Sequence, residues 1–181
     1  MLKLPLALEH ALLGFLRERP MHAYEMHQRL RRADALGRVW SLKQSQLYAL
    51  LARLEEAGYI SVTVEEQGAR PSRRVLHLTE AGRQAFGRWM LEPVEHGRDF
   101  RMEFLAKLFF AQRDSPAAVA TLLERQRAVC WQLLTELHGQ LSPPQGVPVY
   151  ERLVVEFRIG QVDAILRWLD TCAEQLGLTP A

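Results

Sequence analysis

The residues best suited to chemistry in this sequence are three arginines that fall within five positions. Arg70, Arg73 and Arg74 lie in a segment that also contains glycine and proline, residue types that are typical of a turn. Guanidinium groups hold phosphate through paired N–H donors, so a compact cluster of them suits a nucleic-acid backbone. Glu65 and Glu66 partly offset the charge, and charge clusters are more often ordinary solvated surface. The cluster is therefore a candidate phosphate-binding tip.

A helix is predicted just before this cluster, from an N-cap at Ser41 to a C-cap at Gly58. Leu47, Leu51 and Leu54 fall at the spacing i, i+4, i+7, which gives the helix one apolar face. The opposite face is small, polar and barely charged, as a helix needs if its backbone is to approach a DNA groove.

Polar residues near the start of this helix are candidate DNA contacts. Lysine can neutralise a phosphate, glutamine can pair with adenine through two hydrogen bonds, and a tyrosine hydroxyl can donate to phosphate. The candidates are Lys43, Gln44, Ser45, Gln46 and Tyr48. An ordinary solvated helix could carry the same residues. The arginine cluster in the hairpin favours nucleic-acid contact over that alternative.

The elements that must position these residues follow a recognisable order. Helical spacing predicts helices near residues 6–16, 22–34 and 41–58, and another that Thr79 opens and Pro93 ends. Alternating β-branched residues predict strands at 59–64 and 74–79, joined by the basic segment into a hairpin. Three helices, a hairpin and a helix are the order of a winged helix-turn-helix.

The rest of the chain is predicted to be helical. Ser115-Pro116 signals a helix start, an apolar stripe runs to residue 141, and a proline-rich loop precedes a last helix at 149–176. Two long apolar helices joined by one short loop favour a coiled-coil-like homodimer, and the alternative is packing wholly onto the winged domain. The candidate interface residues are Leu133, Leu137, Val154, Phe157, Ile165 and Trp168.

The sequence thus predicts a mainly α protein with a small β-hairpin, built from two domains. Residues 1–90 form the winged helix-turn-helix and residues 91–181 form the helical dimerisation domain. Charge supports this division, because the first part has 14 Lys and Arg against 9 Asp and Glu, and the second has 9 against 12. A basic front half joined to an acidic back half suggests two jobs, one of them polyanion binding.

Several function classes are excluded by composition and motifs. The chain of 181 residues is 48% hydrophobic and 24% charged, close to the globular average, which argues against disorder and low complexity. The histidines are scattered, Cys130 and Cys172 fall in apolar helical stretches as buried thiols would, and no phosphate loop or nucleophile elbow occurs. We expect no enzyme, metal or cofactor. No stretch is long and apolar enough for a membrane helix, which predicts a cytoplasmic protein.

Three segments in this order resemble the PadR family of bacterial transcriptional regulators. They are His22-Ala23-Tyr24-Glu25, the run from Leu47 to Ile60, and the run from Gly68 to Gly82. The match covers residues 8–90, and the remainder resembles the longer C-terminal helical region of the larger subgroup of the family. Two departures occur, since the usual His-Gly-Tyr-Glu has alanine here, and the usual Gly-Thr before the helix tyrosine is Ser45-Gln46.

The resemblance implies a homodimeric repressor that binds a pseudo-palindromic operator in double-stranded DNA. The family's DNA contacts carry over to Tyr24, Tyr48, Arg70 and Arg73, whose motif positions match. Some relatives respond to phenolic acids or planar aromatic drugs near the dimer interface. Trp89 and Trp168 are candidates to line such an effector pocket, although packing in the core or at the dimer interface is the commoner fate of a tryptophan.

Two rival functions remain open at this point. A winged-helix module can bind a protein instead of DNA, and then the arginines are incidental. A small-molecule sensor without DNA activity would show ligand quenching of tryptophan fluorescence and no DNA binding.

Overall fold

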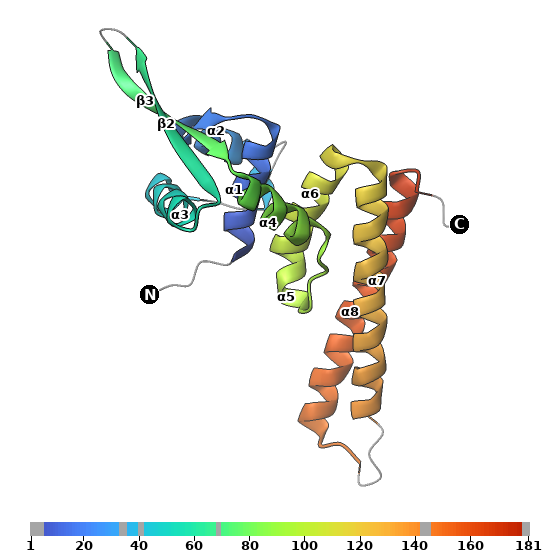
Figure 1. The fold of residues 1–181 in the computed structure, drawn as a ribbon. Coiled ribbons are helices and arrows are strands. Elements are labelled where there is room, and N and C mark those ends of the chain that lie inside the picture. The colour runs from blue at the N-terminus through green and yellow to red at the C-terminus, as the bar shows by residue number, and fades with distance from the viewer. Residues whose placement is uncertain (1–5, 33–35, 40–41, 68–69, 142–145, 179–181) are drawn as a thin grey trace.

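A computed structural model describes residues 6–32, 36–39, 42–67, 70–141 and 146–178. The chain folds into a winged half and a helical half (Figure 1). The hairpin of β2 (Ile60–Gln67) and β3 (Arg70–Leu78) projects from one end of the molecule, and the helical hairpin of α7 (Pro116–Gln140) and α8 (Val149–Gln175) projects from the other. The fold class is as the sequence predicts, mainly helical with one small antiparallel sheet.

The winged half contains three short strands among its helices. In chain order its elements are α1 (Leu6–Glu18), β1 (Met21–His22), α2 (Ala23–Leu30), the 3₁₀ turn η1 (Leu36–Arg38), α3 (Gln44–Glu56), β2 (Ile60–Gln67), β3 (Arg70–Leu78) and α4 (Glu80–Leu91). The strand order is β1-β3-β2, and both pairings are antiparallel.

Local chemistry explains where the elements of the wing begin and end. Gly58 follows α3 with a φ of 72°, a left-handed conformation that favours glycine, and it turns the chain into β2. At the other end of the hairpin, the hydroxyl of Thr79 accepts a hydrogen bond from the backbone N–H of Gly82 and caps α4. These two positions fix both ends of the wing to the body of the domain.

The helical half is built from two long helices and a segment that joins them to the wing. Its elements are α5 (Gly97–Asp99), the π-helical turn η2 (Phe100–Phe104), α6 (Leu105–Asp114), α7 (Pro116–Gln140) and α8 (Val149–Gln175). Ser115 caps α7 by accepting from the N–H of Ala118, with Pro116 in the first turn, as the sequence predicts.

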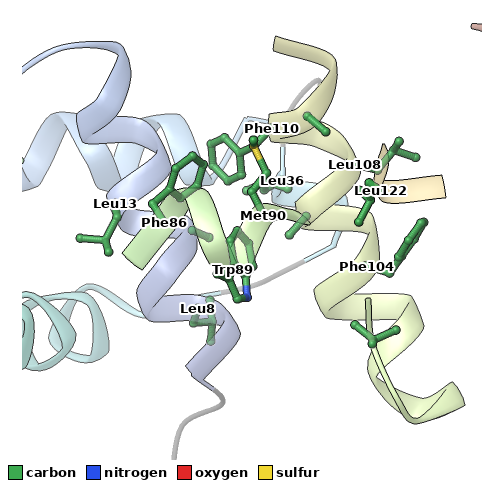
Figure 2. Packing of buried hydrophobic residues seen from close by; sticks show 14 of the residues in the cluster. Leu8, Leu13, Leu36, Phe86, Trp89, Met90, Phe104, Leu108, Phe110 and Leu122 are labelled. Atoms are coloured by element: carbon green, nitrogen blue, oxygen red, sulfur yellow. The ribbon is translucent and has the colours of Figure 1, made fainter. Parts of the chain in front are cut away.

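One hydrophobic core runs through both halves (Figure 2). Phe86 of α4 and Phe110 of α6 meet edge to face, with ring centroids 5.3 Å apart. The ring of Trp89 also packs against that of Phe86, with ring centroids 5.9 Å apart. Because residues from the two predicted domains interleave here, the winged half and the helical half share a buried seam.

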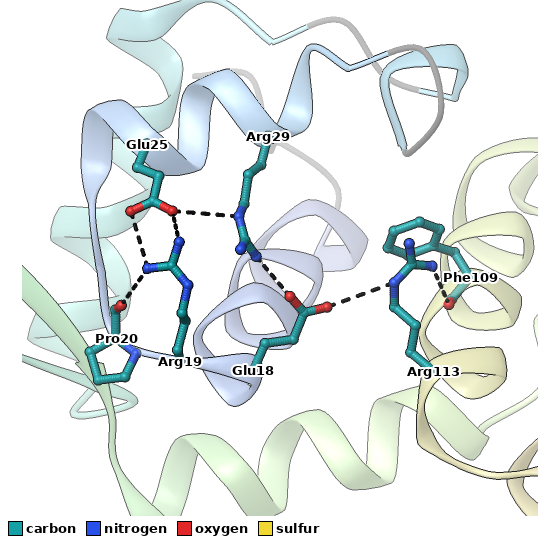
Figure 3. A network of polar contacts seen from close by, with 7 residues as sticks. All are labelled: Glu18, Arg19, Pro20, Glu25, Arg29, Phe109 and Arg113. Carbon is teal, nitrogen blue, oxygen red and sulfur yellow. Dashed lines mark hydrogen bonds and ion pairs between the residues drawn. The ribbon is translucent and has the colours of Figure 1, made fainter.

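A surface network of charges crosses the same boundary (Figure 3). Glu18 at the end of α1 pairs with Arg29 of α2 at 2.7 Å and with Arg113 of α6 at 3.7 Å. Glu25 pairs with Arg19 and Arg29. These contacts tie α2, which precedes α3, to the helical half.

Four details differ from the predictions. Helix α2 ends at Leu30 and α3 begins at Gln44, so the predicted N-cap Ser41 lies outside the helix and outside the described residues. The strands of the wing extend to residues 67 and 70, beyond the alternating segments, because the pairing of two strands uses backbone hydrogen bonds and does not require alternating apolar residues. Strand β1 was not predicted, since two residues carry no periodic signal.

Candidate nucleic-acid interface

Helix α3 presents the surface that its sequence predicts. Leu47, Leu50, Leu51 and Leu54 are buried, whereas Gln44, Ser45, Tyr48, Ala49 and Ala52 are exposed. The Oε1 of Gln46 accepts from the backbone N–H of Lys43 at 3.0 Å, so this side chain caps the helix. Its amide N–H groups remain the donors that could reach a base.

Next to this face, a cleft of about 740 Å³ opens between α2, α3 and the base of the wing. Its lining comes from three separate parts of the chain: His22, Ala23, Tyr24, Glu25, Tyr48, Arg73 and Arg74. The structure thus brings together four residues that the sequence singled out for DNA contact, namely Tyr24, Tyr48, Arg73 and Arg74.

The two tyrosines of the cleft place exposed hydroxyl groups on its walls. Tyr24 is 60% exposed and Tyr48 is 48% exposed. The side-chain amide of Gln28 donates to the Tyr24 hydroxyl oxygen at 2.6 Å, and this leaves the hydroxyl hydrogen available for another acceptor. A phosphate oxygen is the kind of acceptor that such a hydroxyl can serve.

The charge of the cleft depends on which side chains are already paired. Arg74 pairs with Glu55 of α3 at 3.0 Å, and Glu25 is neutralised by Arg19 and Arg29. Arg73 is exposed and makes no ion pair with the described residues. Glu65 lies opposite Arg73 in the register of the hairpin, but within the described part of the chain Arg73 is the cleft cation that no ion pair holds.

His22 braces the cleft from the short strand β1. Its Nδ1 lies 3.1 Å from the backbone oxygen of Arg74. A carbonyl only accepts hydrogen bonds, so Nδ1 carries the hydrogen and donates. This bond fixes the start of α2 to β3, and sequence reasoning missed it because its partners are 52 residues apart.

The tip of the wing lies partly outside the described residues. The backbone of Arg70 pairs with Gln67 at the end of the hairpin, and residues 68–69 are not described. The assignment of Arg70 to DNA contact stays a prediction.

Trp89 does not have the surroundings expected of an effector-pocket residue. It is buried at the seam between the halves, where its Nε1 donates to Glu103 at 2.9 Å. His10 stacks on it, and the ammonium of Lys107, which is only 2% exposed, lies 5.3 Å from its ring. Lys107 also pairs with Glu103 at 2.8 Å. The prediction that Trp89 lines an effector pocket is corrected, because its indole ring packs in the core.

Trp168 does lie beside an open cavity. Phe100 and Phe104 of the π-helical turn stack on each other, with ring centroids 4.4 Å apart. Both rings meet the Trp168 ring edge to face. The adjoining hollow has a volume of about 620 Å³ and is lined by Gly97, Phe100, Arg101, Leu105, Gln161, Ala164, Ile165 and Trp168. Its lining is mainly apolar, with Arg101 as its cation.

The residues predicted for a dimer interface fall into three groups by exposure. Val154 and Phe157 are exposed on α8, and Leu133, Ile165 and Trp168 are half-buried. Leu137 of α7 is fully buried within its own chain and offers no surface to a partner. Its assignment is therefore wrong for this fold.

Within the described residues, the structure holds no cluster of three His, Cys, Asp or Glu side chains that could bind a metal. Burial raises the pKa of the Cys172 thiol to about 11 and also raises that of Cys130. No helix among the described elements has the length and apolar character needed to cross a membrane.

Two family models match the chain, one in each half. Residues 12–88 match the transcriptional regulator PadR-like family, and residues 100–177 match the C-terminal region of virulence activator alpha. The residues between the matches, 89–99, include the end of α4 and the segment that leads to the π-helical turn.

Two relatives are similar over most of their lengths. The probable transcriptional regulator Rv1176c of Mycobacterium tuberculosis is 27% identical, over 94% of this chain and 98% of the relative. The negative transcriptional regulator PadR of Bacillus subtilis is 28% identical, over 81% and 75%. A crystal structure of Bacillus subtilis PadR in complex with operator DNA is also similar, with 24% identity and a TM-score of 0.47. The aligned region covers 91% of this chain and 97% of the PadR chain. The matched proteins are regulators and not enzymes.

Proposed function

Because the chain belongs to the PadR-like family of transcriptional regulators, we propose that it binds a pseudo-palindromic operator as a homodimeric repressor. In this proposal residues 1–90 contact the DNA and residues 91–181 form the dimer. The protein would act in the cytoplasm, where a bacterial chromosome is found.

The observation that carries the proposal is the cleft beside α3. Tyr24, Tyr48 and Arg73 come from α2, α3 and β3, and their exposed polar groups meet at one place. Helix α3 would lie in the major groove while Arg73 and the hydroxyls hold the flanking phosphates. The carboxylate on the cleft wall, Glu25, is already neutralised by arginines and would not repel the backbone.

Base contacts would come from the start of α3. Gln44 and Ser45 are exposed there, and Gln46 has amide donors to spare. Lys43 is exposed just before the helix and suits a phosphate contact. The wing would add Arg70 at its end, and Arg74 would join if its pair with Glu55 opened on the DNA.

A second candidate activity is effector binding in the hollow beside Trp168. The aromatic wall of Phe100 and Trp168, with the buried Phe104 behind it and Arg101 beside it, suits a small planar aromatic ligand that carries an anionic group. We propose that such a ligand relieves DNA binding. Bacillus subtilis PadR has been crystallised in complex with p-coumaric acid, which is a ligand of this kind.

The test is a mobility shift with the DNA upstream of the protein's own gene, at low and high salt, with random duplex as competitor. Retardation that resists the competitor supports a sequence-specific regulator. The same experiment with Arg73→Ala should show weaker binding, while Arg88→Ala, which removes an exposed arginine of α4 outside the cleft, should bind as the parent does.

No retardation at low salt, with the protein folded, would defeat the proposal. A winged-helix module for protein contacts would then be the better description, because such a module has little salt-dependent affinity for DNA.

A further inference from the structure

The π-helical turn η2 lies between the hollow beside Trp168 and the winged half. It interrupts one continuous helix, because α5 runs into it at Phe100 and α6 leaves it at Leu105. The backbone N–H of Leu105 donates to the oxygen of Phe100, where an α-helix would use the oxygen of Arg101. Phe100, Arg101 and Leu105 all line the hollow. The backbone bond that defines the π-helical turn is therefore part of the wall of the hollow.

The same turn holds the winged half through Glu103. Its Oε1 accepts from Nε1 of Trp89 on α4 at 2.9 Å, and it pairs with the ammonium of Lys107 at 2.8 Å. Nζ of Lys107 also donates to the backbone oxygen of Glu92, just after α4, at 2.9 Å. One carboxylate thus ties the turn that borders the hollow to the last helix of the winged half.

Stability alone does not explain the pair of Glu103 and Lys107. The Lys107 side chain is only 2% exposed, and the cost of taking an ammonium and a carboxylate out of water offsets much of their attraction. Apolar residues of similar volume often stabilise such a site equally well. A hydrogen bond of defined direction, by contrast, fixes the position of Trp89 relative to the turn.

Trp89 lies between the turn and α1 (Figure 2). His10 of α1 stacks on its indole ring, with ring centroids 5.6 Å apart and 11° between the ring planes. The preceding residue, Glu9, is 7% exposed and makes an ion pair with Arg53 of α3. Two consecutive residues of α1 therefore contact the indole on one side and α3 on the other.

We infer that Glu103 is a positioning residue that couples the hollow to α3. The inference rests on the proposed relief of DNA binding by a ligand in the hollow, and it names the contacts that carry the effect. The turn has a second arrangement, in which the Leu105 N–H donates to Arg101 as in an α-helix. A ligand shifts such an equilibrium only if it binds the two arrangements differently, and Phe100 and Leu105 give the hollow a different wall in each.

The exchange of backbone partners acts on α3 through Glu103. This residue lies inside the turn, so the exchange draws its carboxylate away from Trp89. The indole then shifts against His10, and α1 carries the shift to α3 through Glu9 and Arg53. The two α3 helices of the proposed dimer lose the spacing that the operator requires.

Two double variants test the bond between Glu103 and Trp89. Both remove the ion pair completely, so neither leaves a buried charge without its partner. The acceptor-keeping variant, Glu103→Gln with Lys107→Met, retains a side-chain oxygen that can accept from Trp89. The acceptor-free variant, Glu103→Leu with Lys107→Met, does not. Trp89→Phe removes the donor instead and leaves the ion pair in place. Circular dichroism establishes that each variant is folded, and Trp89→Phe decides alone if the acceptor-free variant is not.

The readout is the affinity for the DNA upstream of the protein's own gene, measured by fluorescence anisotropy with and without a probe. The probes are three planar aromatic carboxylates: benzoate, indole-3-carboxylate and 2-naphthoate. Loss of binding in Arg101→Ala identifies a probe that occupies the hollow. Such a probe should weaken operator binding at least 10-fold in the parent and in the acceptor-keeping variant. It should weaken operator binding less than 2-fold in the acceptor-free variant and in Trp89→Phe.

A second readout distinguishes positioning from a loss of stability. Coupling between two ligands is reciprocal, so the operator-bound parent should bind the probe at least 10-fold more weakly than the free parent. This ratio should fall below 2 in the acceptor-free variant. Calorimetry on the free protein should give a probe affinity within 3-fold of that of the parent, because neither Glu103, Lys107 nor Trp89 lines the hollow.

The outcomes separate this inference from the proposed function. A parent that does not bind the operator, or whose operator binding no probe weakens, defeats the proposed function and the inference with it. A probe that acts equally on the parent, the acceptor-free variant and Trp89→Phe leaves the effector site standing and overturns the role of Glu103. An acceptor-keeping variant that no longer responds would assign the effect to the ion pair with Lys107, and the inference would again be wrong.

Discussion

Replacing Gln126 by alanine should destabilise the protein more than any exposed substitution, because this side chain holds the segment between the two halves. Gln126 lies on α7 and is 2% exposed. Its Oε1 accepts from the backbone N–H of Val94 at 2.8 Å, and its Nε2 donates to the backbone oxygen of Val94 at 3.0 Å. One amide thus satisfies both backbone groups of a buried residue that lies between α4 and α5.

The magnitude follows from those two bonds. A buried backbone group left without a partner costs about 1–3 kcal/mol, so Gln126→Ala should lower the free energy of unfolding by about 2–6 kcal/mol. Domains of this size are stable by roughly 5–15 kcal/mol in total, so the loss is a large fraction. Gln126→Met keeps most of the volume and should show nearly the same loss, which would attribute the effect to hydrogen bonds.

The assay is urea unfolding followed by circular dichroism and tryptophan fluorescence, at one fixed protein concentration because a dimer links stability to concentration. Gln132→Ala is the control, since Gln132 also lies on α7 and donates to Glu136 on the exposed surface at 3.1 Å. It should change stability by less than about 0.5 kcal/mol. If Gln126→Ala were as mild as the control, the amide would not be what holds Val94, and the reasoning would fail.

Three further predictions concern the interface and the buried thiols. Arg73→Ala should flatten the slope of log affinity against log salt by about 2, because each phosphate contact contributes about 0.9 and the proposed dimer loses one contact in each of two subunits. The change should be equal for operator and random DNA. An unchanged slope in fluorescence anisotropy titrations would exclude Arg73 from the DNA contacts. Glu55→Gln should release Arg74, tighten DNA binding and steepen the same slope, and weaker binding would contradict the role of this ion pair. Burial raises the pKa of Cys172 to about 11 from its usual 9.0, so the unfolded thiol ionises first and the stability of the parent should fall relative to Cys172→Ala as pH rises from 9 towards 11. Urea midpoints that keep a constant difference over pH 8–10.5 would refute the burial argument.

The sequence predicts best those elements whose signals are local. Ser115 with Pro116, and Thr79 before α4, are caps in the structure as the residue types indicate. The exposed face of α3 also follows from the spacing of its leucines, so the exposure of Tyr48 needs no tertiary information.

Features that depend on distant partners could not be predicted. The pairing of Arg74 with Glu55, and of β1 with β3, joins segments whose contact is created by the fold. Trp89 shows the limit most clearly, since helical spacing places it on an apolar face but does not say whether that face meets a pocket or another helix. Here it meets α1, α6 and the buried Lys107, and becomes part of the seam.

The shared core has a mechanical consequence for recognition. Since α4, α6 and α7 pack through one seam, a displacement of the helical half is passed to the winged half through packed side chains. Helix α8 is 27 residues long, or about 40 Å, so it works as a lever arm. A rotation of about 5° about one end of α8 would move its other end by about 3–4 Å, a tenth of the roughly 34 Å between successive major grooves on one side of DNA. In the proposed homodimer, a ligand in the hollow would then need to rotate the helical half only slightly to put two α3 helices out of phase with their half-sites.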